Sequence, residues 1–150
     1  MRYYIKALIF AFAAVFAINV SAHAADPIYT ARFSNLALDG YDAVAYFSLG
    51  APVKGAAEFS TEYEGAQWRF SSAENLAAFQ ENPLAYAPQY GGYCAWALSQ
   101  NKLARGNPQN WNIVDGKLYM NYDDKIQARW AKDIPGFIAL ADQYWPDILD

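Results

Sequence analysis

The side chains in this sequence that could carry out chemistry are few, and they centre on one thiol. Cys94 is the only cysteine and follows Gly91-Gly92, and Met120 is the only methionine after Met1. A thiolate and a thioether are soft ligands of the kind copper(I) prefers, so Cys94 and Met120 are a candidate metal pair. A cysteine near a helix start can also be a reactive thiol, and a free cysteine is often simply a buried, small apolar residue. The sequence leaves these three interpretations open.

The only histidine is His23, close to the start of the chain. Histidine is the usual general base and the commonest metal ligand. Without a later histidine, a serine–histidine–aspartate triad cannot be built from the rest of the chain. We identify no catalytic residue, and the composition favours a non-enzymatic protein.

Aromatic residues make up 17% of the chain. Most of them should form the core, since they bury large areas, but a few could line an apolar pocket with hydroxyl groups at its edge. The stretch around Gly91-Gly92 is the first place to expect one, because glycine permits close approach of a backbone. A tight turn is the simpler alternative there. The candidate binding residues are Tyr41, Asp42, Tyr90, Tyr93, Cys94 and Trp96.

Positions 1–24 have the order of a secretory signal peptide. Arg2 and Lys6 precede an apolar run at positions 7–20, and Ser21-Ala22-His23-Ala24 offers a small-residue cleavage site. The run is shorter than the roughly 20 residues that a membrane span requires. We expect cleavage between Ala24 and Ala25 and a periplasmic or secreted mature protein.

Removal of positions 1–24 takes away Arg2 and Lys6 and leaves a mature chain with more acidic than basic residues. Nine basic and 15 acidic residues remain, which gives a net charge of −6. An acidic chain without a basic cluster is a poor partner for nucleic acid or anionic lipid. No later apolar stretch is long enough to cross a membrane, so we expect no stable membrane insertion after cleavage. The expected partner is a small ligand or another exported protein.

Turn signals predict two β-hairpins. Residues 59–63 and 67–70 flank Glu64-Gly65, and residues 111–114 and 117–122 flank Asp115-Gly116. The apolar residues 43–47 suggest a further buried strand. We find no internal repeat.

Capping signals predict several short helices. Ser71 and Glu74 form a capping box before one helix, residues 83–87 form a helical turn, and residues 93–100 form another helix. Asp123 caps the next, and Pro135 suits the first position of a last helix that ends near Tyr144. Ile138, Ala141 and Trp145 should form its apolar stripe. The fold class is therefore α+β: a small single domain with two hairpins and several short helices.

Several of these segments resemble YHS domains, and in particular an exported branch of that family. The resemblance spans residues 38–145 and is carried by the segments Gly40-Tyr41-Asp42-Ala43-Val44-Ala45-Tyr46-Phe47, Trp68-Arg69-Phe70-Ser71-Ser72, Asn82-Pro83-Leu84-Ala85-Tyr86, Pro88-Gln89-Tyr90-Gly91-Gly92-Tyr93-Cys94 and Val114-Asp115-Gly116-Lys117-Leu118-Tyr119.

The resemblance implies a possible association with heavy metals. Metal-linked YHS domains carry an F-C-S-x-x-C segment, whose two thiolates can hold a soft metal together. Ser71 and Asn75 stand at those two cysteine positions here, and neither is a soft ligand. The cysteine pair of the family therefore cannot be transferred to this chain.

The sequence thus predicts a signal peptide at residues 1–24, a lead-in at 25–37, of which 25–35 should be loosely held, and a YHS-like domain at 38–150. The leading hypothesis is an exported, non-enzymatic binding or accessory protein with an aromatic pocket near Tyr41, Tyr93, Cys94 and Trp96. The first alternative is a periplasmic copper-type metal-handling protein that uses Cys94. The second is a thiol-dependent redox protein, which would require an external thiol because the chain has no second cysteine.

Overall fold

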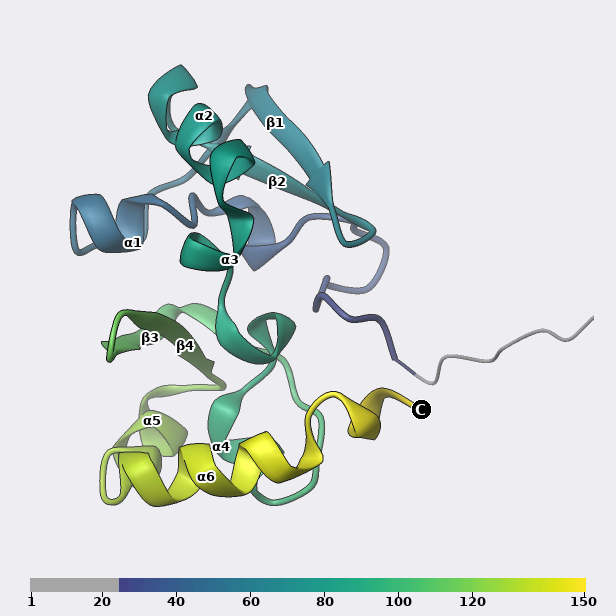
Figure 1. Cartoon of the computed structure of the whole chain (residues 1–150), viewed down its shortest axis with the longest axis vertical. Helices are drawn as coiled ribbons and strands as arrows, with labels where there is room; N and C mark the ends of the chain where they lie inside the picture. Colours follow the sequence, from purple (N-terminus) through teal and green to yellow (C-terminus); the bar gives the residue numbers. More distant parts are fainter. Residues whose placement is uncertain (1–24) are drawn as a thin grey trace, which may run out of the picture.

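Two antiparallel β-hairpins organise the chain, in a computed structural model that describes residues 25–150 (Figure 1). Strand β1 (Ala56–Tyr63) pairs with β2 (Ala66–Phe70), and β3 (Asn107–Val114) pairs with β4 (Lys117–Asn121). Both predicted hairpins are confirmed, and the first strand of each begins earlier than predicted, beyond a bulge in its register. The predicted signal peptide lies outside the described residues.

Short helices surround the hairpins, so the α+β class is confirmed. The α-helices are α1 (Ala45–Ser48), α2 (Ala73–Glu81), α3 (Pro83–Tyr86), α4 (Ala95–Ser99), α5 (Asp124–Trp130) and α6 (Ile134–Tyr144). Three 3-10 turns complete the described fold: η1 (Leu38–Gly40), η2 (Gln89–Gly92) and η3 (Asp147–Leu149). None of the helices in residues 25–150 has the length and apolar content that a membrane span requires.

The predicted strand at residues 43–47 is wrong, because this segment turns into helix α1. The cause is Asp42, whose Oδ1 accepts hydrogen bonds from the backbone N–H groups of Val44 at 2.9 Å and Ala45 at 3.1 Å. An aspartate that satisfies the first N–H groups of a segment stabilises a helical start. Capping by Asp42 therefore favours a helix in this segment, although the apolar run alone would favour a strand.

The predicted cap of α2 is wrong by one residue. Ser72, not Ser71, is the N-cap, and its hydroxyl oxygen accepts a hydrogen bond from the N–H of Asn75 at 3.1 Å. Ser71 instead donates its hydroxyl to Oδ2 of Asp42 at 2.7 Å. Asp123 caps α5 as predicted, through a 2.8 Å bond from the N–H of Ile126.

Two apolar clusters form the interior. The first core is built around Tyr46, Trp68, Phe70 and Phe79, and the second around Tyr90, Leu98, Tyr119 and Trp130. The hairpin β3–β4 contributes to both, since Leu118 and Met120 belong to the first core and Tyr119 to the second. Successive side chains of a strand point to opposite faces, so β4 contributes to one core from each of its faces.

The last helix packs as its apolar stripe predicts. Ala141 is fully buried in the second core, with Ile138 and Trp145 beside it. The helix starts at Ile134, so Pro135 lies one position later than predicted. Figure 1 shows α6 running along α4 at the end of the molecule distant from β1 and β2.

The two hairpins follow the same scheme of backbone pairing. Positions 56, 60, 61, 62 and 63 of β1 pair with positions 70, 69, 68, 67 and 66 of β2. Positions 107, 111, 112, 113 and 114 of β3 pair with positions 121, 120, 119, 118 and 117 of β4, which is the same scheme at a constant offset. Both hairpins also lead directly into a helix with a side-chain N-cap, α2 in one case and α5 in the other.

The expectation of a loosely held lead-in is also wrong. The N–H of Tyr29 donates to the carbonyl of Gly91 at 2.9 Å, and the N–H of Ala25 donates to the carbonyl of Leu149 at 3.2 Å. Thr30 pairs with Ala37 in an antiparallel bridge, and Ile28 is buried in the first core. The lead-in is therefore held against η2, against η3 and in the first core.

Buried tyrosines should make the fold sensitive to alkali. Burial raises the pKa of Tyr46 and of Tyr90 well above the ordinary value near 10, and the hydrogen bond from Tyr90 to Asp142 raises the pKa of Tyr90 further. Each hydroxyl keeps its proton longer in the folded chain than in the unfolded chain. Their contribution is thus complete below about pH 10 and falls as pH rises beyond it.

We expect the free energy of unfolding, measured by urea titration, to be level from about pH 7 to 9 and to decline steeply between about pH 10 and 11. Tyr90→Phe should lower stability at neutral pH but flatten that decline. A free energy of unfolding that stays level throughout this range would contradict the prediction.

Candidate functional site

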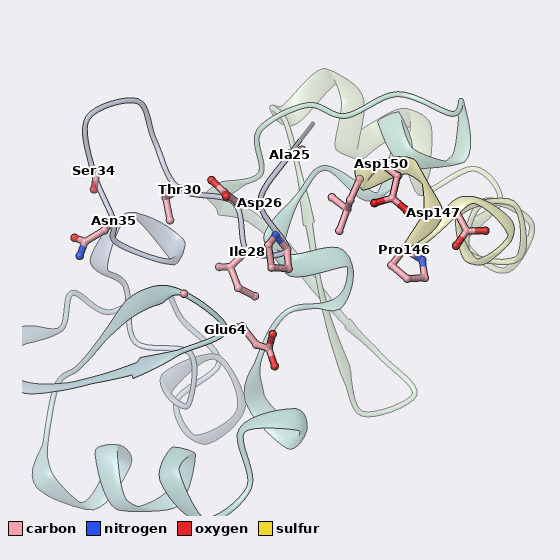
Figure 2. Close-up of a pocket in the computed structure, with 13 residues that line it drawn as sticks. Ala25, Asp26, Ile28, Thr30, Ser34, Asn35, Glu64, Pro146, Asp147 and Asp150 are labelled. Carbon is pink, nitrogen blue, oxygen red and sulfur yellow. The ribbon is translucent and has the colours of Figure 1, made fainter. Parts of the chain in front are cut away.

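The main pocket of the described residues lies between the lead-in and the C-terminal turn η3. It has a volume of about 740 Å³ and is lined by Ala25, Asp26, Pro27, Ile28, Thr30, Ser34, Asn35, Glu64, Gly65, Pro146, Asp147, Leu149 and Asp150. The lead-in, the turn of the first hairpin and the C-terminal turn η3 each supply one wall (Figure 2). Its position follows from the bond between Ala25 and Leu149, which brings the lead-in against η3.

The pocket combines apolar and acidic groups. Ile28 and Leu149 are only 7% and 8% exposed, so they form part of its floor. Asp26, Glu64 and Asp147 are exposed residues on different sides of the opening (Figure 2). Ligand pockets typically have volumes of about 300–1,000 Å³ with a few polar groups at fixed positions. The space suits a small organic molecule, and the carboxylates favour a positive charge on it.

A second, smaller hollow of about 400 Å³ lies between α2 and α3. It is lined by Ala78, Glu81, Asn82, Ala85 and Tyr86. It has one carboxylate and little apolar wall.

Tyr90 and Tyr93 are brought together by the structure, but as packed side chains. Both rings contact Trp145, with centroids 6.0 and 6.3 Å away. The hydroxyl of Tyr90 donates to Asp142 at 2.8 Å, and that of Tyr93 donates to the carbonyl of Asp26 at 2.9 Å. These bonds join α6 and the lead-in to η2.

Cys94 is the N-cap of α4 and is completely buried. Its sulfur accepts a hydrogen bond from the N–H of Ala97 at 3.5 Å and lies 3.6 Å from Oδ1 of Asn121. That same oxygen accepts the N–H of half-buried Trp96 at 3.2 Å. Burial raises the pKa of Cys94, although the backbone N–H groups of Ala97, Tyr122 and Trp96 oppose the shift.

Met120 pairs with Cys94 in a parallel backbone bridge, so the two residues are neighbours as the copper hypothesis requires. Met120 is 1% exposed and belongs to the first core. Within residues 25–150, no group of three or more histidine, cysteine, aspartate or glutamate side chains is placed to hold a metal ion.

Tyr41 and Asp42 lie at the other end of the molecule, beside the first hairpin. Tyr41 is half-buried, with the ammonium of Lys54 4.0 Å from its ring centroid. Asp42 is completely buried, and its Oδ2 accepts bonds from the N–H and the hydroxyl of Ser71 and from Nδ2 of Asn75, at 2.7–2.8 Å.

The positions of the family's metal-binding cysteines are thus filled by a hydrogen-bonded cluster. Ser71 and Asn75 both donate to Asp42, and the distance between Nδ2 of Asn75 and the hydroxyl of Ser71 is 3.4 Å. These hard donor groups already satisfy one another, and soft metals prefer thiolates. The residues present here do not fit the metal that the resemblance implies.

None of the six candidate binding residues lines the main pocket. The lead-in and the last turn carry no motif, and Asp26 and Pro146 stand near opposite ends of the chain, so no local pattern places them together. The role of the six residues in binding remains a prediction.

The environment of Cys94 predicts a thiol that does not react in the folded protein. A buried thiol with a raised pKa stays protonated, and the thiolate is the nucleophile. We expect maleimide labelling at neutral pH to be at least about 100-fold slower in the native, reduced chain than in urea. Rapid native labelling would contradict this and would revive the redox alternative. Cys94→Ala controls for non-specific labelling.

Comparison with known proteins identifies one family. The family model of the YHS domain matches residues 44–90, which run from the N-terminus of α1 to η2 and include the first hairpin and α2. No curated protein and no solved structure matches the chain. The first hairpin and α2 lie within the matched segment and Asp42 lies just before it, so this part of the chain is similar to a YHS domain.

Proposed function

We propose that this chain is an exported, non-enzymatic binding protein that takes a small organic cation in the pocket between its lead-in and the C-terminal turn η3. The observation that carries the proposal is the pocket itself, with a volume of about 740 Å³ and both apolar and acidic walls. Export is supported by the order of charged, apolar and small residues in positions 1–24. The absence of histidine after His23 favours binding over catalysis.

A cation with an apolar body suits both kinds of wall. Ile28, Leu149 and the two prolines Pro27 and Pro146 offer apolar surface. The carboxylates of Asp26, Glu64 and Asp147 stand at the opening, and the mature chain has an overall negative charge. Clefts lined by one sign of charge concentrate counter-ions at the site. An anion would be repelled by these carboxylates.

Calorimetric titration of the mature chain tests this proposal. Choline and spermidine would serve as cationic probes, and acetate and inorganic phosphate as anionic probes. At least one cation should bind with a Kd below about 1 mM, and no anion should. Glu64→Gln and Asp147→Asn should each weaken binding about threefold to tenfold, since rim charges contribute modestly.

Glu81→Gln is the matched control, because it removes the same charge at the smaller hollow between α2 and α3. If it weakens cation binding as much as Glu64→Gln does, the effect is that of net charge and the pocket is not the site. Absence of binding for both cations would also overturn the proposed ligand class.

The export part is tested separately by intact mass analysis of the protein recovered from the periplasm or medium. Its mass should correspond to a chain that begins at Ala25. A full-length chain retained in the cytoplasm would exclude export without bearing on the pocket.

Soft-metal handling is a second candidate, favoured by the backbone bridge between Cys94 and Met120. Copper(I) held by a competing chelator should then be taken up by the reduced mature chain, and Met120→Leu should abolish the uptake. Equal uptake by the wild-type chain and by Cys94→Ala would remove this candidate.

A further inference from the structure

We infer that residues 90–133 are a second copy of the folding unit formed by residues 38–82, and that Cys94 is the helix-capping residue of that copy, equivalent to Asp42. The first copy contains most of the segment that matches the YHS family model, and the second copy lies outside it apart from its first residue, Tyr90. Four sets of structural observations support the equivalence.

The hairpins agree pair by pair. The pair Thr61–Trp68 corresponds to Asn112–Tyr119, and every other pair repeats at the same offset in residue number. The irregularity repeats as well, since the register shifts between positions 56 and 60 in one hairpin and between 107 and 111 in the other. A bulge re-aims a strand at one position, so its recurrence at the same place is a specific feature.

The segments before the hairpins agree in backbone conformation. Leu38, Asp39 and Gly40 have φ of 51°, 51° and 80°, and the residues at positions 90–92 have φ of 55°, 61° and 87°. Three consecutive left-handed residues are rare outside special turns. In both places the triplet leads into a short helix, α1 or α4.

The bonds that follow these triplets also agree. Tyr41 forms an antiparallel β-bridge with Lys54, and Tyr93 forms one with Arg105. The N–H of Asp42 donates to the carbonyl of Val53 at 2.8 Å, and the N–H of Cys94 donates to that of Ala104 at 2.9 Å. The loop from position 42 to position 53 is one residue longer than the loop from position 94 to position 104, so the first copy carries a single insertion here.

The segments after the hairpins agree in capping and packing. Ser72 caps α2, and Asp123, at the same offset as the hairpin pairs, caps α5. Phe79 and Trp130 are related by this offset too, and both are completely buried. Asn82 and Asp133 then stand at the N-caps of α3 and α6 with similar backbone angles, φ −149° and −156°.

The copies differ where one packs on the other. Trp111, Leu118 and Met120 of the second hairpin lie in or against the first core. The equivalent positions of the first hairpin are polar: Ser60, Gln67 and Arg69. The second copy therefore covers the first, whereas the equivalent positions of the first hairpin offer no apolar surface for such a contact. Terminal units of a repeated array typically have such polar outer faces.

The equivalence gives Cys94 a structural role. Asp42 accepts the N–H groups of residues 44 and 45 at the start of α1, and the sulfur of Cys94 accepts that of Ala97 at the start of α4. Asn121 lies beside Cys94, and its buried Nδ2 has no hydrogen-bond partner among the described residues. In the first copy, the amide Nδ2 of Asn75 donates to the capping carboxylate. A carboxylate at position 94 would offer Asn121 the same kind of partner.

Substitution at position 94 in the full mature chain tests this inference. A capping position tolerates residues that accept hydrogen bonds, whereas an ordinary core position tolerates apolar residues of similar size. We expect Cys94→Ser to raise the unfolding equilibrium constant less than Cys94→Ala and Cys94→Val do, by about fivefold. Cys94→Asp should fold, and it should be no less stable than Cys94→Val.

The reverse order, with Ala or Val more stable than Ser, would overturn the capping role. If Cys94→Asp does not fold, the comparison of Ser with Ala still decides. Cys94→Ser should also bind the cationic pocket probes as the wild type does, so a capping defect and a failure of the proposed function are distinguishable.

Substitution of the equivalent N-caps of α2 and α5 provides a second test of the inference. Ser72→Asp and Asp123→Ser exchange the residues of the two copies, and each should change the unfolding constant by less than about threefold. Ser72→Ala and Asp123→Ala should each raise it by about fivefold or more. If only one of the two positions responds to alanine, they are not equivalent, and the inference of a second copy fails.

Discussion

Asp42→Ala is expected to destabilise the fold by about 3–5 kcal/mol, because it leaves several buried donors without an acceptor. The Asp42 carboxylate accepts five hydrogen bonds, from the N–H groups of Val44, Ala45 and Ser71, the Ser71 hydroxyl and the Asn75 amide. These bonds connect the start of α1 to the start of α2. Equilibrium urea unfolding measures the loss.

Asp42→Asn keeps the shape of the side chain but removes its charge and one of its two acceptor oxygens. Its amide oxygen can still accept the two N–H groups at the start of α1, but its NH₂ group would face the donors of Ser71 and Asn75. We expect it to recover less than half of the loss. Glu58→Ala, at an exposed position of β1, is the control and should change stability by less than about 0.5 kcal/mol. Similar losses for Asp42→Ala and Glu58→Ala would show that the carboxylate cluster contributes little.

Gly91→Ala is expected to detach the lead-in from η2 and to cost about 3 kcal/mol or more. Gly91 has φ of +61°, where a non-glycine residue costs about 1–2 kcal/mol. A Cβ at this position would also overlap the carbonyl oxygen of Pro27, a backbone atom that cannot move without displacing the lead-in. Because Pro27 and Ile28 line the pocket, the same change should abolish binding of the cationic probes.

Gly50→Ala isolates the backbone contribution. Gly50 has φ of +63°, but no atom lies within 4 Å of the position its Cβ would take. It should therefore cost only the conformational penalty, about 1–2 kcal/mol. Amide exchange gives a second readout, since the N–H of Tyr29 donates to Gly91 and should lose protection only in Gly91→Ala. Equal stability of the two variants, with Tyr29 still protected, would contradict the expected overlap.

Cys94 shows how the tertiary structure changes the interpretation of a single residue. The sequence offered a metal ligand, a reactive thiol or a core residue. The structure places the thiol out of solvent, with its sulfur accepting the Ala97 N–H at 3.5 Å and Asn121 beside it. Burial opposes ionisation, which both the copper and the redox hypotheses require. The labelling and copper experiments distinguish these alternatives directly.

The inferred repeat has only a short trace in the sequence. Gly40-Tyr41-Asp42-Ala43-Val44-Ala45 and Gly92-Tyr93-Cys94-Ala95-Trp96-Ala97 are identical at four of their six positions. Such a short match is easily produced by chance. The larger part of the repeat is carried by backbone geometry, in which Phe79 and Trp130 or Ser72 and Asp123 play the same part without being the same residue. Different sequences can satisfy one set of backbone hydrogen bonds.

The sequence alone determined the features that depend on neighbouring residues. Glu64-Gly65 and Asp115-Gly116 specify both hairpins, since left-handed turn residues and the strands beside them act locally. Asp123 specifies the start of α5 for the same reason. The family resemblance likewise came from short contiguous segments.

Only the tertiary structure decided the features that depend on residues far apart in the chain. Asp42 directs residues 45–48 into a helix while it bonds to Ser71 in a different element. The pocket exists because Ala25 meets Leu149. Long-range packing and hydrogen bonding set burial, pKa and the shape of a site, and their energies depend on which distant groups meet, which no local pattern of residue types encodes.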